Sequence, residues 1–186
     1  MTPNQIPAPA RRADAERNRE KILGTARAAF AEPGAAVSMA EISRRAGVGM
    51  ATLYRNFPGR RELLEALYVD EVDAICAAAD TADGNTPGAT LAAWLRRFVD
   101  FFASKHDIGI ELLEQTDRDN PVFDSSRARV LAAGRPLLLA AQQSREVREH
   151  LTLEQVLDMV IAIRGEPGYL EPILQAALDG IRRPAP

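Results

Sequence analysis

The strongest constraint on the fold is a pair of short helical segments separated by a glycine turn. Ser38 and Glu41 match the S-x-x-E capping box, which predicts that a short helix begins at Ser38. Gly47 then supplies a residue that readily adopts the left-handed conformation at a helix end. Residues 50–56 form about two further helical turns before the break at residues 58–59. Two short helices joined by a tight turn predict a helix-turn-helix.

Helical periodicity also dominates the chain on both sides of this pair. A helix is expected from Arg17 to the break at Pro33, and another from Leu63 to about Asp83. Residues 1–15 carry three prolines and little apolar surface, which is typical of a flexible basic arm. Further helices are predicted at 89–105, 107–118, 121–145, 152–165 and 169–183, with Asn120 and Thr152 as N-caps.

The absence of an alternating strand pattern makes the expected fold all-α, with about nine helices. We expect residues 16–62 to form the helix-turn-helix domain and residues 63–186 to form a larger helical bundle.

Charge is distributed unevenly between these two parts. Residues 1–61 hold 11 of the 23 Lys and Arg residues but only 5 of the 26 Asp and Glu residues. A basic front suggests a module that binds a polyanion. Solvated helix faces can carry the same excess, so charge alone leaves both interpretations open.

Several other classes of protein are disfavoured. Apolar runs such as 137–141 and 159–163 are far shorter than the roughly 20 residues that span a bilayer, and no apolar segment follows Arg12, so we expect a cytoplasmic protein without a secretory signal or membrane contact. A single cysteine, Cys76, cannot form an intrachain disulfide and is expected to fill the core. With two histidines and no phosphate-binding glycine loop, nucleophile elbow or metal-ligand spacing, the sequence predicts no enzyme, cofactor or metal site.

The run from Ser38 to Leu64, SMAEISRRAGVGMATLYRNFPGRRELL, resembles the DNA-binding signature of the tetracycline-repressor-like (TetR) family, and the likeness extends over residues 17–75. It implies a repressor that binds double-stranded operator DNA and is released when a small-molecule effector fills the larger domain. The alternative is that the bound protein activates transcription instead of repressing it. The sequence departs from the family pattern at Gly49, Met50, Ala51 and Gly59, so an operator cannot be transferred from relatives.

The outward side of the helix at 50–56 carries the expected base contacts. Thr52 and Arg55 lie on this side, and Arg55 can donate two hydrogen bonds to a guanine. Met50 and Ala51 offer apolar surface to thymine methyl groups. Asn56 either reads adenine or holds a phosphate.

Contacts with the DNA backbone are expected from this helix and from the helices that precede and follow it in the sequence. The phenol of Tyr54 can reach a phosphate, the alternative being a half-buried aromatic side chain. Ser38 and Met39 start the preceding helix and Arg60 starts the following one. By the resemblance, these three positions touch the DNA backbone, where helix amino termini also favour phosphate.

The resemblance further implies a ligand cavity among the central helices. The residues assigned to it are Trp94, Phe98, Phe102, Glu111, Gln115, Phe123, Arg127 and Met159. The apolar members fit an apolar or aromatic effector, and the polar members would add specificity. A helical bundle needs the same apolar side chains for its core, so core packing is the alternative for each of them.

The last two predicted helices carry apolar stripes that the resemblance places at a two-fold interface. The stripes comprise Leu153, Val156, Leu157, Val160, Ile161, Ile173, Leu174, Ala177, Leu178 and Ile181. We expect them to form a four-helix bundle in a homodimer, with ordinary core packing as the alternative. Such a dimer would read two half-sites about one helical turn of DNA apart, or a multiple of this.

One rival function remains at this point: a helical ligand-binding or protein-interaction module without DNA binding. Thr52, Tyr54 and the basic front favour the regulator.

Overall fold

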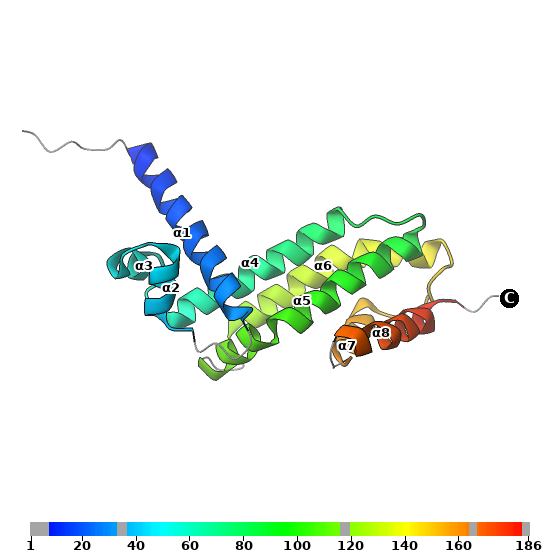
Figure 1. Ribbon diagram of the computed structural model, residues 1–186. Coiled ribbons are helices and arrows are strands. Elements are labelled where there is room, and N and C mark those ends of the chain that lie inside the picture. The colour runs from blue at the N-terminus through cyan, green and yellow to red at the C-terminus, as the bar shows by residue number, and fades with distance from the viewer. Residues whose placement is uncertain (1–7, 33–36, 116–119, 164–166, 184–186) are drawn as a thin grey trace, which may run out of the picture. The chain divides into compact units, whose positions relative to one another are not determined.

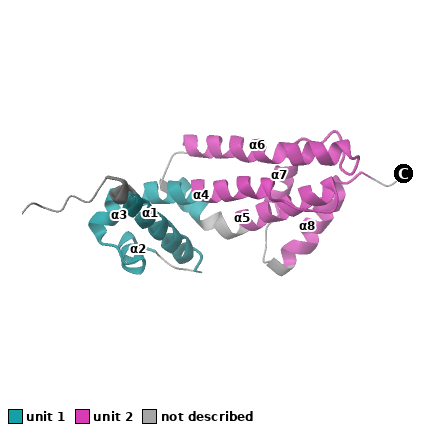
Figure 2. Cartoon of the chain, turned by 90° about the horizontal axis from the view of Figure 1, so that it is seen from above, with its two compact units in different colours: residues 1–68, 107–117 teal, residues 69–106, 118–186 magenta. Residues whose placement is uncertain are grey.

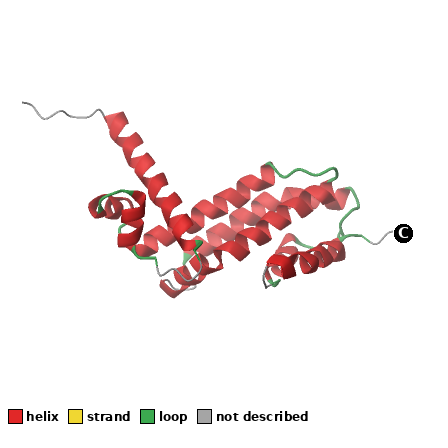
Figure 3. Cartoon of the chain, viewed as in Figure 1, coloured by secondary structure: helices red, strands yellow, loops and turns green. Residues whose placement is uncertain are grey.

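The computed structural model describes residues 8–32, 37–115, 120–163 and 167–183, and most of them are helical (Figures 1 and 3). In these ranges the helices are α1 (Ala8–Phe30), α2 (Met39–Ala46), α3 (Met50–Asn56), α4 (Arg60–Asp80), α5 (Pro87–Gln115), α6 (Pro121–Gln143), α7 (Leu153–Ile161) and α8 (Pro167–Ile181). The described part of the chain contains no strand, only an isolated antiparallel bridge between Val147 and Arg182. The predicted all-α fold is confirmed.

The chain divides into two compact units (Figure 2). The first contains residues 1–68 and 107–117, and the second contains residues 69–106 and 118–186. Beyond the predicted 16–62, the first unit therefore also takes in the start of α4 and the last turns of α5.

Helix α1 begins earlier than the sequence analysis expected. It starts at Ala8, so residues 8–15 of the predicted flexible arm are helical. Alanine and arginine are strong helix formers, and Pro9 is tolerated because it lies in the first turn, where its missing N–H has no helical partner. Residues 1–7, the rest of the predicted arm, lie outside the described residues.

The caps of α2 lie where they were predicted. Ser38 Oγ accepts a hydrogen bond from the Glu41 backbone N–H at 3.1 Å, and Gly47 ends the helix with φ of 59°. The reciprocal half of the capping box is replaced, because the Glu41 carboxylate binds two arginines of its own helix instead. The complete box forms at α7, where Thr152 and Gln155 each bond the other's backbone N–H.

The structure also differs from the sequence-based prediction at helix α5. The expected helices 89–105 and 107–118 are one continuous helix, Pro87–Gln115. Residues 103–107 contain neither proline nor glycine, so no backbone feature interrupts the helix between them. Asn120 caps α6 as predicted, with its side chain accepting from the Val122 N–H at 3.0 Å.

The core of the second unit is centred on Trp94. In this unit α5, α6 and the corresponding part of α4 run side by side (Figures 1 and 2). Trp94 is fully buried, and its Nε1–H donates to the Ile75 carbonyl of α4 at 3.1 Å. Gly134 of α6 lies directly against the indole, since a Cβ built there would be 2.3 Å from the ring. The close approach of α5 and α6 thus depends on a residue without a side chain.

Candidate nucleic-acid interface

The inner side of the helix-turn-helix is an apolar core. Leu53 and Phe57 are buried, as are Ile42 and Ala46 of the α2 segment and Ile22 of α1. The spacing of Leu53 and Phe57 puts both on one side of the helix, and this is the side that is buried. Because α3 has only seven residues, this anchoring by tertiary packing holds it in helical form.

The opposite side of α3 is exposed. Tyr54 is 46% and Met50 38% exposed, and both are large side chains without a covering element. Ala51 and Arg55 are also exposed, and Thr52 is partly so. This side therefore offers one phenol, one guanidinium and two apolar side chains to an outside surface, which are groups that bind phosphates, guanine and thymine methyls.

Two polar side chains of α3 bond within the helix. Arg55 Nη2 donates to Thr52 Oγ1 at 2.9 Å, which lays the guanidinium along the exposed side. Asn56 Nδ2 donates to the Thr52 carbonyl at 2.8 Å. The amide of Asn56 therefore faces its own backbone in this structure, and its contact with adenine or with a phosphate stays a prediction.

The start of α2 presents two predicted backbone contacts. Ser38 is exposed and its hydroxyl oxygen serves as the cap, while Met39 is partly exposed. The N–H groups of the first turn that have no helical partner lie beside them and can bind an anion.

Arg60 was predicted to contact the DNA backbone, but in this structure its side chain binds groups of the protein itself. Its Nε donates to the Glu111 carboxylate, its Nη1 donates to the Val37 carbonyl, and its guanidinium lies over the Phe30 ring at 5.2 Å. The side chain is directed into the first unit, because these protein groups provide the partners that a phosphate would otherwise supply.

The two arginines of α2 are neutralised locally. Hydrogen bonds from Arg44 and then Arg45 lower the pKa of Glu41 to about 2, so this carboxylate is charged at any ordinary pH. Arg45 also pairs with Glu32 at 2.5 Å. Their net contribution to a phosphate-binding surface is correspondingly small.

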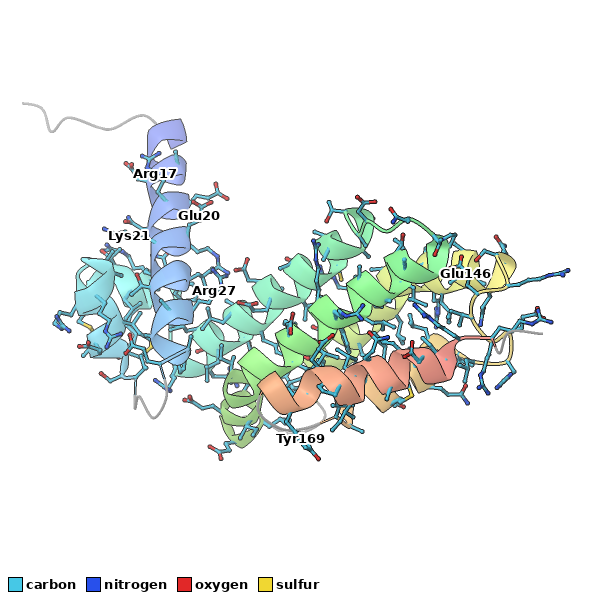
Figure 4. All side chains as sticks on the ribbon, turned by 45° about the vertical axis from the view of Figure 1, so that its right-hand side comes forward. Arg17, Glu20, Lys21, Arg27, Glu146 and Tyr169 are labelled. Atoms are coloured by element: carbon cyan, nitrogen blue, oxygen red, sulfur yellow. The ribbon has the colours of Figure 1, made fainter. Side chains whose placement is uncertain are left out.

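Helix α1 contributes cations that the sequence analysis did not select. The Lys21 ammonium lies beside Gly47, at the turn between α2 and α3, and Arg19 stacks over the Phe57 ring at 4.7 Å. Figure 4 marks Arg17 and Lys21 one turn apart on α1. This i, i+4 spacing of basic residues was the available signal, but a solvated helix face has the same pattern.

The predicted ligand residues occupy different environments. Three of them form a stack along α5, with ring centroids 5.8 Å apart for Trp94 and Phe98 and 5.0 Å apart for Phe98 and Phe102. Trp94 and Phe98 are buried in the core, whereas Phe102, Phe123 and Met159 are partly buried.

The polar members of the predicted ligand set do not join this stack. Arg127 is exposed and faces Asp158 at 3.8 Å, and Glu111 belongs to the first unit, where it binds Arg60. Each of these two side chains has a protein partner, and their contact with a ligand stays a prediction. The side chain of Gln115 lies outside the described residues.

The second unit contains a cavity that is lined by residues other than the predicted ligand residues. It has a volume of about 360 Å³ and is lined by Gly88, Ala92, Glu146, Val147, Leu178, Ile181, Arg182 and Arg183. None of the predicted ligand residues lines it. Glu146, marked in Figure 4, accepts hydrogen bonds there from the hydroxyls of Thr86 and Ser144.

The predicted dimer residues are mostly interior. Leu153, Val156, Leu157, Val160, Leu174, Leu178 and Ile181 are buried within the subunit itself. The apolar stripes of α7 and α8 therefore pack inward, which favours core packing, the stated alternative, for these seven residues. Ile161 and Ala177 are partly buried, and Ile173 remains 37% exposed.

Comparison with known proteins assigns the family. Residues 22–67 match the model of the bacterial regulatory proteins of the tetR family, and residues 86–183 match that of the C-terminal domain of SbtR-like transcriptional regulators. The chain belongs to the TetR family. This confirms the resemblance seen in the sequence, and the protein is a TetR-family transcriptional regulator.

Solved structures agree with this assignment. A TetR transcriptional regulator from Streptomyces coelicolor is 32% identical, with a TM-score of 0.72 over 90% of this chain and 99% of that one. A TetR transcription regulatory protein from Mycobacterium vanbaalenii is also 32% identical, with a TM-score of 0.73 over 92% and 99% of the two chains. Comparison with curated protein sequences gives no significant match.

The described residues contain neither a membrane-spanning helix nor a metal-binding cluster. Among the described helices, none combines the length and the apolar character needed to cross a membrane. Within the same residues, no group of three or more His, Cys, Asp or Glu side chains is placed to hold a metal ion.

Proposed function

We propose that this TetR-family regulator is a repressor that binds operator DNA through the exposed side of α3. The observation that carries the proposal is the exposure of Tyr54, Met50, Ala51 and Arg55 on one side of a helix whose other side is anchored by Leu53. A short helix held in this way fits the major groove and presents its polar groups to base edges and phosphates. Thr52 supports Arg55 from within the same side. A protein acting on the bacterial chromosome would work in the cytoplasm.

Phosphate contacts in this proposal come from several elements. Tyr54 belongs to α3, Ser38 and Met39 lie at the start of α2, and Lys21 lies beside the turn that joins the two. Binding of this kind releases counterions from the DNA, so the affinity depends steeply on salt.

Salt dependence provides the test of this function. A labelled duplex would be enriched from a random-sequence DNA pool by the wild-type protein, and its affinity measured by fluorescence anisotropy at increasing KCl. We expect the affinity to fall about a thousandfold or more between roughly 50 and 200 mM KCl, as for a protein that makes several phosphate contacts. Failure to enrich any sequence, or an affinity that salt leaves unchanged, would contradict operator binding.

We further propose that the regulator is a homodimer formed through the exposed side of α8. Tyr169 is 65% exposed and projects outward in Figure 4. Pro172, Ile173, Ala176 and Gly180 follow it on the same side at helical spacing, and all are exposed or partly exposed. Small residues allow two helices to approach closely, and an isologous contact would pair this stripe with its own copy. The inward stripe of Leu174 and Leu178 supports it from beneath.

Substitution of Ile173 by Glu is expected to dissociate this dimer. Two symmetry-related carboxylates would be buried in one interface, so the dimer dissociation constant should rise at least about a hundredfold. Sedimentation velocity measures the change directly. Leu139→Glu is the matched control, because Leu139 is 55% exposed on α6, away from the stripe. Retention of the dimer by Ile173→Glu, or its loss in both variants, would rule out the α8 stripe.

Release by a small molecule is the remaining part of the proposed function. An effector can dissociate the complex only if it binds the conformation that does not fit the operator better than the one that does. The stacked rings of Phe98, Phe101 and Phe102 on α5 are the best candidates for contact with an apolar or aromatic effector, because Phe101 and Phe102 are only partly buried. Native mass spectrometry of the purified protein would detect an effector retained from the expression host.

A further inference from the structure

We infer that Arg60 is a positioning residue for the helix-turn-helix and that Glu111 is the partner that holds it, so that neither acts by touching DNA or effector. This inference rests on the proposed operator binding. It assigns a role to two residues, one predicted to bind phosphate and the other predicted to bind a ligand.

The side chain of Arg60 contacts segments that are far apart in the sequence. Arg60 starts α4, and Glu111, which binds its Nε, lies 51 residues later near the end of α5. The Nη1 donor of the same guanidinium holds the carbonyl of Val37, the residue immediately before the cap of α2. Its planar face covers Phe30, the last residue of α1. One side chain thus connects parts of α1, α4, α5 and the entry to α2.

Both partners of the Arg60–Glu111 ion pair are partly buried, which restricts the orientation of the guanidinium. Arg60 and Glu111 are each only 27% exposed, so water screens this ion pair only in part. Arginine presents a rigid fork of N–H donors that can serve a carboxylate and a carbonyl at once. Lysine carries the same charge but lacks this planar fork. The contact with Glu111 helps to fix the direction of the guanidinium that donates to the Val37 carbonyl.

A phosphate contact and a positioning contact predict opposite results for Glu111. If electrostatics alone mattered, Glu111→Gln would remove a negative charge and free Arg60, so DNA binding would become tighter. If Arg60 positions α2, the same substitution loosens the entry to the helix-turn-helix and weakens binding. We expect operator affinity to fall about tenfold, with the slope of its salt dependence unchanged.

The experiment measures the full-length wild type, Glu111→Gln, Arg60→Lys, Arg60→Gln and the Arg60→Gln/Glu111→Gln double variant on the enriched duplex over a range of KCl. Arg60→Lys should weaken binding about as much as Arg60→Gln despite keeping its charge, and the double variant should bind no more weakly than the single ones. Glu114→Gln is the matched control, because Glu114 is an exposed carboxylate on the same helix. Its affinity should stay at the wild-type level or rise slightly.

Three results would overturn the inference while leaving operator binding in place. They are tighter binding by Glu111→Gln, full retention of affinity by Arg60→Lys, and a salt slope in Arg60→Gln that is shallower by about one, as expected when a cation that binds phosphate is removed. Because Glu111→Gln keeps the size of the side chain, the sign of its effect decides the question even if an Arg60 variant fails to fold. A wild-type protein that binds no DNA would instead remove the proposed function and this inference with it.

Discussion

Gly134→Val is expected to lower the free energy of unfolding of the second unit by about 3 kcal/mol. This is the largest effect on stability that we predict for a single substitution. Even the first added carbon would lie 2.3 Å from Cη2 of Trp94 and 2.9 Å from Cδ2 of Leu153. The indole cannot move aside, because it is fully buried and its N–H is held by the Ile75 carbonyl. Helices α5 and α6 must therefore separate, which opens the core around Trp94.

The chain provides its own probe for this measurement. Trp94 is its single tryptophan, so the urea midpoint followed by tryptophan fluorescence reports on the affected core. Gly24→Ala is the control, since nothing lies within 4 Å of a Cβ there and alanine favours the helix by up to about 1 kcal/mol. If Gly134→Val unfolded at the wild-type urea concentration, the described packing of α5 against α6 would be wrong.

Replacement of both Tyr54 and Arg55 by alanine is expected to lower operator affinity at least about a hundredfold while leaving stability unchanged. The two side chains supply the phenol and guanidinium of the exposed side of α3, and each good base or phosphate contact contributes about 1–3 kcal/mol. Neither side chain is part of the core, so the urea midpoint should not move. Fluorescence anisotropy on the enriched duplex measures the affinity.

The matched control for this double variant is Arg44→Ala. Arg44 is also an exposed arginine of the helix-turn-helix, but its guanidinium pairs with Glu41 at 2.6 Å. Its removal should change the operator affinity less than about threefold. Equal reductions in Arg44→Ala and the Tyr54/Arg55 variant would mean that general charge, and not the α3 surface, determines binding.

Local features of the sequence were sufficient to predict the DNA-binding unit. Ser38 and Gly47 specify the start and end of α2 through backbone hydrogen bonding and a left-handed φ, and both effects act within a few residues. The burial of Leu53 and Phe57 follows from helical spacing alone. Such short-range signals can be interpreted without knowledge of the tertiary structure.

The proposed dimer surface could not be predicted in the same way. A stripe such as Leu153, Val156 and Leu157 shows that a helix buries one side, but not whether the covering element belongs to the same subunit. In this protein the strongest stripe packs inward. The outward stripe contains Tyr169, Ala176 and Gly180, whose small or amphipathic side chains give only a weak hydrophobic pattern.

Long-range polar pairing was equally inaccessible from the sequence. Nothing near Arg60 indicates that its partner is Glu111, because an ion pair between distant residues depends on the path of the intervening helices. The continuity of α5 through residues 103–107 determines where Glu111 lies, and this was the helix that the sequence analysis divided.

The central claim is that the exposed side of α3 lies in a groove of operator DNA. Photo-crosslinking of the enriched duplex, with 5-iodouracil in place of thymine at successive positions, tests it most directly when the linked peptides are mapped by mass spectrometry. We predict crosslinks within residues 50–56, with Tyr54 and Met50 as the main sites. Crosslinks confined to α6, α7 or α8, with none in α3, would contradict it.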